Sequence, residues 1–393
     1  MVSESMLKLG TTRSCIRELF EYGNRQAAII GRENVYDYSL GNPSIPAPAE
    51  VNTAFASIVT ETDSLAVHSY TSATGAVNAR QAVADDLNAR YNAGIRAENL
   101  FFTCGAAPAL VSVIRALAVD GAEVMAIAPF FPEYRPFVEQ NGAKFVPVPA
   151  DTESFQIDFA AAEALISTHT QAIIVNSPNN PTGVVYTQET LEKLGALLTR
   201  KGEEYGHPIY LIADEPYREL VYDGAVVPFI PNIYPNTIVC YSWSKSLSLP
   251  GERIGYVCVP DQAADQAAVY AAVSGAARIL GHVCAPSLQQ LVVAQCVGLR
   301  PDLEAYDRNR RTLYEALTSY GYHCAKPDGA FYLFVEAPGG DAQAFSDKAK
   351  ARNLLIVPGA DFGCATHFRI STCVSYDMIV RSLPIFKDLI EGK

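Results

Sequence analysis

Short apolar runs alternate with stretches of helical periodicity through the middle of the chain, from about residue 70 to residue 260. The runs are Leu100–Thr103, Val124–Ala128, Ala143–Val148, Ala172–Asn176, Tyr210–Ala213, Thr237–Tyr241 and Gly255–Val259. Apolar residues at helical spacing separate several of them, for example between residues 110 and 117 and between residues 191 and 198. Nearly continuous apolar strands separated by helices are typical of a sheet covered on both faces. This pattern predicts an α/β fold with a mainly parallel sheet.

The pattern changes on both sides of this region. A helix is expected within residues 11–32, followed by a short strand near residues 36–40 and an extended, proline-rich segment that begins at Pro43. After about residue 285 we expect a long helical stretch, residues 288–320, with a break near residues 298–301. Strands at residues 330–335, 354–357 and 367–371, a helix near residues 341–351 and a final amphipathic helix follow. These elements predict a smaller α+β lobe.

Charge and cysteine content argue against several classes of protein. The 393 residues include 30 basic and 42 acidic ones, a net charge of −12, which argues against a nucleic-acid partner. No apolar run approaches the ~18 residues that a membrane span needs, and the N-terminus lacks the pattern of a signal peptide. The nine cysteines are scattered without a C-x-x-C pair, as in reduced cytosolic proteins without a disulfide framework or metal site. We therefore expect a cytoplasmic protein without nucleic-acid, membrane or metal partners.

A lysine among hydroxyl groups is the first candidate for chemistry. Lys245 follows the apolar run at residues 237–241, so it is expected where a strand ends. A lysine in such a place is a candidate amine for forming an imine with an aldehyde. Ser242, Ser244 and Arg253 suit a nearby phosphate group. Together these features suggest pyridoxal phosphate (PLP), although a solvated lysine in a serine-rich loop explains this window equally well.

Other polar or small residues follow the predicted strands, and open α/β sheets bind ligands beyond the carboxyl ends of their strands. Gly105, Ala106 and Ala107 open a helix whose backbone amides suit a phosphate, although any such turn favours glycine. Asp214 ends an apolar strand, where a buried carboxylate needs a cationic partner. A protonated pyridine nitrogen fits that need. Capping of the next helix is the ordinary alternative for Asp214.

Four more residues complete this group. Tyr217 and Asn180 suit hydrogen bonds to the phenolic oxygen of the cofactor, although both also fit turn and packing roles. Phe131 suits stacking on a pyridine ring, or simply a place in the core. Arg369 lies in an otherwise apolar strand, where its guanidinium needs a carboxylate partner, either from a substrate or from an acidic residue of the chain.

The order of these segments resembles the class I/II aminotransferases of the aspartate and aromatic type, which are fold-type-I PLP enzymes, over essentially the full length. The matching segments are Tyr70-Thr71-x-x-x-Gly75, Thr103-x-Gly105-Ala106, Asn180-Pro181-Thr182-Gly183, Asp214-Glu215-x-Tyr217, Ser242-x-Ser244-Lys245-x-x-x-x-Pro250-Gly251-x-Arg253-x-Gly255 and Phe368-Arg369-Ile370-Ser371. Each segment is modest alone, but all six in this order are highly specific.

The resemblance implies a fold and a role for each matching residue. A mainly parallel seven-stranded sheet sandwiched by helices would form a large domain at residues 45–290, and residues 1–44 and 291–393 would form a small domain. Lys245 would carry the cofactor as an internal aldimine and then move the proton, with Asp214 and Tyr217 as catalytic neighbours. The other implied contacts are Asn180 at the phenolic oxygen, Phe131 on the ring, Gly105, Ala106, Ala107, Ser242, Ser244 and Arg253 at the phosphate, and Arg369, Asn180 and Gly41 at the substrate.

Two further points follow from the resemblance. Tyr70 would reach the phosphate of the neighbouring subunit, so the enzyme would be a homodimer with shared sites. Ala106 and Ala107 depart from the pattern, because many relatives place Ser or Thr there; the backbone amides can still serve.

The function implied by the resemblance is ping-pong transamination between an L-amino acid and a 2-oxo acid. A β-eliminating lyase on the same scaffold is the main alternative, and a PLP-sensing effector domain is a more distant one. A dehydrogenase would need a G-x-G-x-x-G segment after the first strand, and the sequence has none. The preferred amino acid stays open. Candidate arginines for an acidic side chain are Arg13, Arg17, Arg25, Arg32 and Arg278, and candidate aromatic residues for a pocket are Phe20, Tyr22, Phe130, Phe131 and Tyr134.

Overall fold

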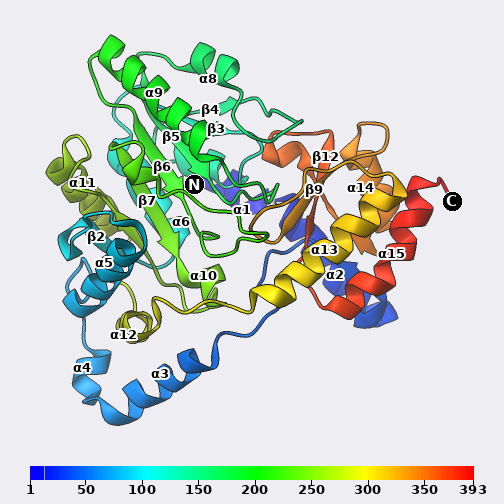
Figure 1. Ribbon diagram of the computed structural model, residues 1–393, viewed down its shortest axis with the longest axis horizontal. Coiled ribbons are helices and arrows are strands. Elements are labelled where there is room, and N and C mark those ends of the chain that lie inside the picture. Colours follow the sequence, from blue (N-terminus) through cyan, green and yellow to red (C-terminus); the bar gives the residue numbers. More distant parts are fainter. Residues whose placement is uncertain (13) are drawn as a thin grey trace.

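A seven-stranded sheet forms the centre of the larger lobe in the computed structural model, which describes residues 1–12 and 14–393 (Figure 1). Its strand order is β2-β8-β7-β6-β5-β3-β4. The strands are β2 (Leu100–Thr103), β3 (Glu123–Ile127), β4 (Lys144–Val148), β5 (Thr170–Asn176), β6 (Tyr210–Asp214), β7 (Thr237–Ser242) and β8 (Gly255–Cys258). Only β8 runs antiparallel to its neighbours. The mainly parallel α/β sheet predicted from the sequence is confirmed.

Helices cover both faces of this sheet, which explains the continuous apolar runs. Alternate strand residues such as Ile174 and Cys240 pack in one core with α6 (Ala106–Leu117), α7 (Tyr134–Glu139) and α11 (Gln266–Ile279). Their neighbours Ile173 and Val239 pack in the opposite core. The helices on that side are α3 (Ala49–Glu61), α4 (Ser64–His68), α5 (Val77–Tyr91), α8 (Phe159–Leu165), α9 (Gln188–Tyr205) and α12 (Ser287–Cys296). Since nearly all strand positions are buried, with exceptions such as Lys144 and Pro147 on the edge strand β4, the sequence shows no regular polar alternation.

The smaller lobe joins the N-terminal segment to the C-terminal third. Its three-stranded antiparallel sheet has the order β11-β12-β9, formed by β9 (Tyr332–Glu336), β11 (Val357–Pro358) and β12 (His367–Ser371). A separate parallel pair joins β1 (Tyr36–Asp37) to β10 (Leu354–Leu355). The apolar run at residues 354–357, predicted as one strand, is therefore divided between two sheets. The helices of this lobe are α2 (Cys15–Ile30), α13 (Leu303–Tyr320), α14 (Ala342–Lys350) and α15 (Tyr376–Ile390).

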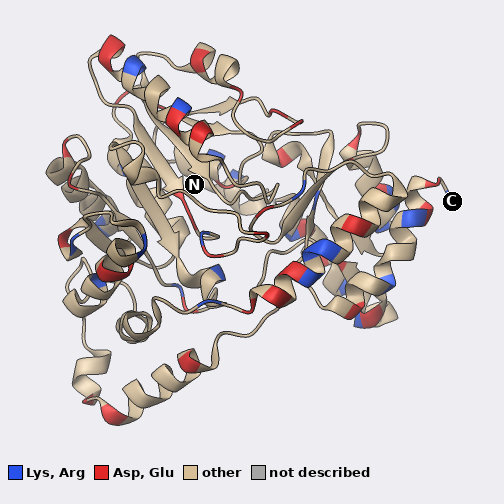
Figure 2. Cartoon of the chain, viewed as in Figure 1, with Lys and Arg blue, Asp and Glu red and all other residues tan. Residues whose placement is uncertain are grey.

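The predicted break near residues 298–301 lies between α12 and α13. The Asp302 side chain accepts a hydrogen bond from the backbone N–H of Ala305 and so caps the start of α13. Both acidic and basic residues lie along α13, whereas α12 carries no charged residue (Figure 2). The remaining elements are α1 (Glu4–Thr11), α10 (Trp243–Ser246) and short 3-10 helices at Arg32–Asn34, Ala97–Asn99, Ile230–Asn232 and Gly359–Phe362. No helix in residues 1–12 and 14–393 is long and apolar enough to cross a membrane.

Candidate active site

Most of the residues predicted for the site line one cavity of about 290 Å³ at the carboxyl ends of the sheet strands. They are Gly41, Ala106, Ala107, Phe131, Asn180, Asp214, Tyr217, Ser242, Ser244, Lys245, Arg253 and Arg369. Gly105 immediately precedes α6 as its N-cap residue. Tyr70 is the exception, because its side chain is 86% exposed and does not line this cavity.

Lys245 occupies the short helix α10, which begins directly after the fully buried strand β7. Its Nζ donates a hydrogen bond of 2.6 Å to the backbone carbonyl of Gly41, which lies in the segment between the two lobes. Burial, together with the charges of Arg253 and Arg369, lowers the pKa of the Lys245 amine to about 8. The amine is therefore largely neutral at mildly alkaline pH, as a nucleophile or base must be.

Asp214 ends β6 and is only partly satisfied by the protein. Tyr134 donates a hydrogen bond of 2.5 Å to its Oδ2 atom. The Oδ1 atom is buried and has no hydrogen-bond partner in the described chain. Burial is the main reason that the pKa of Asp214 rises to about 7. A buried carboxylate oxygen without a partner is costly, so Oδ1 is suited to a cationic N–H group supplied by a ligand.

A cradle for an anion lies at the start of α6. Gly105 adopts a φ of 97°, and a Cβ atom added there would lie 2.5 Å from Nη2 of Arg253. The positive φ favours glycine at this position, and the absence of a side chain leaves room for the Arg253 guanidinium. Ser242 and Ser244 add hydroxyl groups 3.1 Å apart. Free backbone N–H groups of a helix N-terminus, an arginine and two hydroxyls are donors that suit a phosphate.

Arg369 brings a second guanidinium into the cavity, and it makes no ion pair with an acidic residue in the described part of the chain. Its Nη1 atom donates to Oδ1 of Asn180 at 3.0 Å, and Nη2 donates to the backbone carbonyl of Ser39 at 2.5 Å. Its Nε atom is buried without a hydrogen-bond partner among the described residues. The sequence left open whether Arg369 pairs with an acidic residue of the chain. Its observed partners are neutral groups, so the guanidinium is suited to a carboxylate from a ligand.

Three residues of the site have contacts that the sequence analysis did not predict. Tyr134 was considered only for an aromatic pocket, whereas its hydroxyl holds Asp214. Tyr332 lies on the apolar strand β9, and its hydroxyl lies 3.1 Å from that of Tyr217. Asn176 donates to the backbone carbonyl of Asp214 at 2.8 Å and accepts from the backbone N–H of Asn180 at 2.7 Å. The only signal in the sequence was that a buried tyrosine hydroxyl or amide needs a partner.

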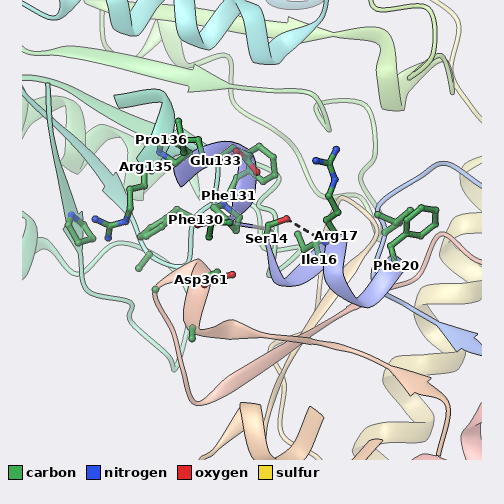
Figure 3. Close-up of a pocket in the computed structure, with 18 of the residues that line it drawn as sticks. Ser14, Ile16, Arg17, Phe20, Phe130, Phe131, Glu133, Arg135, Pro136 and Asp361 are labelled. Carbon is green, nitrogen blue, oxygen red and sulfur yellow. Dashed lines mark hydrogen bonds between the residues drawn. The ribbon is translucent and has the colours of Figure 1, made fainter. Parts of the chain in front are cut away.

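A larger cleft of about 1210 Å³ adjoins this cavity and shares Ile16 and Phe131 with it (Figure 3). The first turns of α2 form one side, and the segment from Phe130 to Pro136 forms another. The Arg17 side chain points away from Ser14 and Asp361 (Figure 3). Of the five candidate arginines, Arg13 lies outside the described residues, and of the other four only Arg17 lines either cavity.

Some of the candidate aromatic residues also line a cavity, and others do not. Phe20 and Phe130 line the cleft, and Phe131 lines both cavities. Tyr22 instead packs with the N-terminal core around Leu19. No group of three or more metal-ligating side chains was found among the described residues.

Comparisons with known proteins show the family of this chain. The family model for aminotransferase class I and II matches residues 32–382. The aspartate/prephenate aminotransferase of Thermus thermophilus is 28% identical over 92% of this chain and 93% of its own length. The aromatic-amino-acid aminotransferase 2 of Thermococcus litoralis is 25% identical over 96% of both chains.

Solved structures give the same result. An amino transferase from Eubacterium rectale has a TM-score of 0.98 at 56% identity, covering 100% of this chain and 99% of its own. The aspartate aminotransferase of Thermotoga maritima has a TM-score of 0.87 at 25% identity, covering 99% of this chain and 100% of its own. The family is one that uses PLP. Sequence, fold and site together establish that this chain is an enzyme of the class I and II aminotransferase family.

Proposed function

We propose that this enzyme binds PLP at Lys245 and transfers an amino group from an L-amino acid to a 2-oxo acid, with donor and acceptor bound in turn at one site. PLP, when bound, carries the amino group between the two substrates and withdraws electrons from the substrate Cα atom. The observation that carries the proposal is the presence in one cavity of a partly buried lysine with a lowered pKa and a buried carboxylate oxygen that lacks a partner among the described residues.

The residues present fit the cofactor at two points, the pyridine nitrogen and the phosphate. Asp214 Oδ1 offers its free lone pairs to the pyridine nitrogen while Tyr134 occupies Oδ2. The cradle of Gly105, Arg253 and the start of α6 fits the phosphate. The remaining contacts proposed from the sequence are Ala106, Ala107, Ser242 and Ser244 at the phosphate, Phe131 on the ring, and Asn180 and Tyr217 at the phenolic oxygen.

Proton movement falls to Lys245. Its amine, with a pKa of about 8, would take the proton from the substrate Cα atom and hold it on Nζ. The Gly41 carbonyl, 2.6 Å from Nζ, holds the released amine close to the reacting atoms.

Arg369 and Asn180 are the proposed grip for the substrate α-carboxylate. Their 3.0 Å hydrogen bond fixes the guanidinium, and the unpaired Nε leaves capacity for a carboxylate. Gly41 lies beside this grip.

The adjoining cleft is the proposed place for the substrate side chain. Ile16 and Phe131 border both cavities, so the cleft lies next to the place proposed for the reacting part of the substrate. Phe20 and Phe130 offer apolar surface, and Arg17 offers a cation. These groups suit bulky side chains that are aromatic or end in a carboxylate. Relatives named for aspartate, prephenate and aromatic amino acids fit this range.

A homodimer completes the proposed site. Tyr70 is 86% exposed at the end of the segment that includes α4, and Leu65 on α4 is 77% exposed. Large exposed side chains on one segment suit burial against a second subunit. In that arrangement Tyr70 reaches the phosphate of the neighbouring site. We further propose that residues 1–44 and 291–393 form the small domain that closes over the substrate bound to residues 45–290.

Borohydride reduction tests the proposal directly. The protein is incubated with PLP, reduced, digested and mapped by mass spectrometry. A reduced PLP adduct on Lys245 is expected, and an adduct elsewhere or none would contradict the proposal. A β-eliminating lyase would give the same adduct, but it would release ammonia and pyruvate from a suitable amino acid in the absence of any oxo acid.

A further inference from the structure

Tyr332 stands between the two halves of the proposed site. It lies on β9, where its backbone pairs with Ser371 of β12, two positions beyond Arg369. Its side chain is 2% exposed and lines the same cavity as Lys245. A buried tyrosine hydroxyl in a cavity needs a partner, and a buried aromatic face needs a packing surface. The structure supplies a hydrogen-bond partner for the hydroxyl and a packing surface for the ring, and these two contacts lie in different parts of the site.

The hydroxyl of Tyr332 contacts the cofactor side. Its oxygen lies 3.1 Å from the hydroxyl oxygen of Tyr217. Burial raises the pKa of Tyr332 to about 12 and that of Tyr217 well above its usual value, so both keep their hydrogens near neutral pH. If Tyr217 gives its one hydrogen to the phenolic oxygen of the cofactor, its own oxygen must accept the hydrogen of Tyr332.

Gly41 leaves the space that the Tyr332 hydroxyl occupies. A Cβ atom added to Gly41 would overlap the Tyr332 hydroxyl, so the absence of a side chain at residue 41 is what makes room for it. The same Gly41 carries the carbonyl that accepts from Lys245.

The ring of Tyr332 contacts the substrate side. The Arg369 guanidinium carbon lies 4.7 Å from the ring centroid, the geometry of a cation–π contact. This contact supports the guanidinium without using any of its N–H donors, so the unpaired Nε–H and the Nη hydrogens not given to Asn180 and Ser39 stay available for a carboxylate.

We propose that Tyr332 is a positioning residue with two separable parts. Its hydroxyl donates to Tyr217 and strengthens the hydrogen bond from Tyr217 to the cofactor's phenolic oxygen. Its ring orients Arg369 for the substrate α-carboxylate. The inference rests on the proposed function and deepens it. Hydrogen bonds in a chain polarise one another, so loss of the first weakens the second.

The two parts predict two different readouts. Donation to the phenolic oxygen stabilises its ionised form and lowers the pKa of the Lys245–cofactor linkage. Tyr332→Phe removes only the hydroxyl, so it raises that pKa, by about half a pH unit. Tyr332→Leu removes the ring as well, so it also weakens binding of an α-methyl amino acid, which binds through its carboxylate but has no Cα proton to lose.

The experiment is an absorbance titration of the holoenzyme between pH 5 and pH 10, with binding of the α-methyl amino acid measured on each variant. Tyr222→Phe is the matched control, because Tyr222 is a buried tyrosine of the same cluster that donates to the Ala330 carbonyl at 2.6 Å. Its titration is expected to equal that of the wild type. Tyr217→Phe is expected to give a larger shift than Tyr332→Phe, and the double variant is expected to equal Tyr217→Phe alone.

The possible outcomes distinguish a failure of the role proposed for Tyr332 from a failure of the proposed PLP-dependent function. A Tyr332→Phe enzyme that titrates like the wild type, or a shift that persists in the Tyr217→Phe background, would overturn the hydroxyl's role. Equal binding of the α-methyl amino acid by the Phe and Leu variants would overturn the ring's role. A wild-type protein without any pH-dependent cofactor absorbance would instead overturn the proposed function itself.

Discussion

Tyr134 donates a hydrogen bond of 2.5 Å to one oxygen of Asp214 and leaves the other oxygen buried without a partner. The two residues come from different elements, since Tyr134 begins α7 and Asp214 ends β6. The bond favours the ionised carboxylate and partly offsets the burial that raises its pKa. It also fixes the carboxylate so that Oδ1 faces the space where the pyridine nitrogen is proposed to lie.

Removing this bond should weaken the grip on the cofactor. In Tyr134→Phe the pKa of Asp214 rises further, so more of the carboxylate is protonated at neutral pH and cannot pair with a protonated pyridine nitrogen. We expect PLP affinity to fall about tenfold, by analogy with other buried hydrogen bonds to charged groups, and the acid limb of the kcat profile to move to higher pH. Equilibrium dialysis and a pH–rate profile measure these effects.

Tyr234→Phe is the control for this change. Tyr234 is also buried and donates to the Ile209 carbonyl at 2.6 Å, away from the cavity. PLP affinity should not change in this variant. A Tyr134→Phe enzyme with wild-type affinity and an unchanged acid limb would show that Asp214 does not depend on Tyr134.

Lys245 should reduce the stability of the cofactor-free protein. Its pKa falls from 10.5 to about 8 on folding, so below about pH 8 the charged amine is buried at full cost, and above about pH 10.5 it is neutral in both states. Lys245→Met should therefore raise the free energy of unfolding by about 2 kcal/mol at pH 7, and the gain should shrink between pH 8 and pH 10.5. Urea unfolding of the PLP-free proteins measures it; an equal gain at all pH values would contradict the account.

Gly41 should tolerate no side chain. In Gly41→Ala the added Cβ overlaps the Tyr332 hydroxyl and displaces the segment whose carbonyl accepts from Lys245. We expect kcat/KM to fall by about a hundredfold or more, since small misplacements of reacting groups are costly. Gly275→Ala is the control, because a Cβ atom there meets nothing within 4 Å on α11 and should stabilise the helix by about 0.5–1 kcal/mol. Comparable activity in the two variants would remove Gly41 from the site.

Arg17 should discriminate between substrate side chains. It is the one candidate arginine among the described residues that lines the cleft beside Ile16 and Phe131. Arg17→Gln should lower kcat/KM for aspartate and glutamate by about 10–100-fold, the value of a lost charged contact, and leave phenylalanine little changed. Steady-state kinetics with the three donors test this. An equal loss of kcat/KM for all three donors would mean that Arg17 supports the structure and does not recognise the substrate side chain.

Tyr70 should act across a subunit boundary. Mixing two nearly inactive variants, Lys245→Ala and Tyr70→Ala, gives mixed dimers that have one doubly altered site and one intact site. After subunit exchange in equal amounts, half of the dimers are mixed, so activity should recover to about a quarter of the wild-type value. No recovery, with mixed dimers confirmed by native mass spectrometry, would mean that Tyr70 does not serve the neighbouring site.

Much of the fold and most of the proposed site residues could be predicted from the sequence for physical reasons. The sheet strands are buried on both faces, so they read as continuous apolar runs. Lys245, Asp214 and Arg369 carry charge at strand ends or inside an apolar strand, where charge is costly without a purpose. Such residues stand out in a sequence without any knowledge of the structure.

What could not be predicted depends on contacts between distant segments. Tyr332 lies in an apolar strand and reads as core, and its partners Tyr217 and Gly41 are far away in the sequence. Tyr134 reads as an aromatic after a strand, and its partner Asp214 is 80 residues away. The division of residues 354–357 between two sheets depends on pairing with β1 and β12, which no local pattern encodes.

Amino-group transfer through a cofactor on Lys245 is tested most directly by a single-turnover absorbance scan of the PLP-loaded protein, with one amino acid at a time and no oxo acid. We expect the absorbance band of the Lys245-linked cofactor to convert once to a stable pyridoxamine phosphate band. Adding an oxo acid should then restore the original band. The amino acid that reacts fastest would name the donor class. Return of the original band with continuing release of ammonia would contradict the account and identify a lyase.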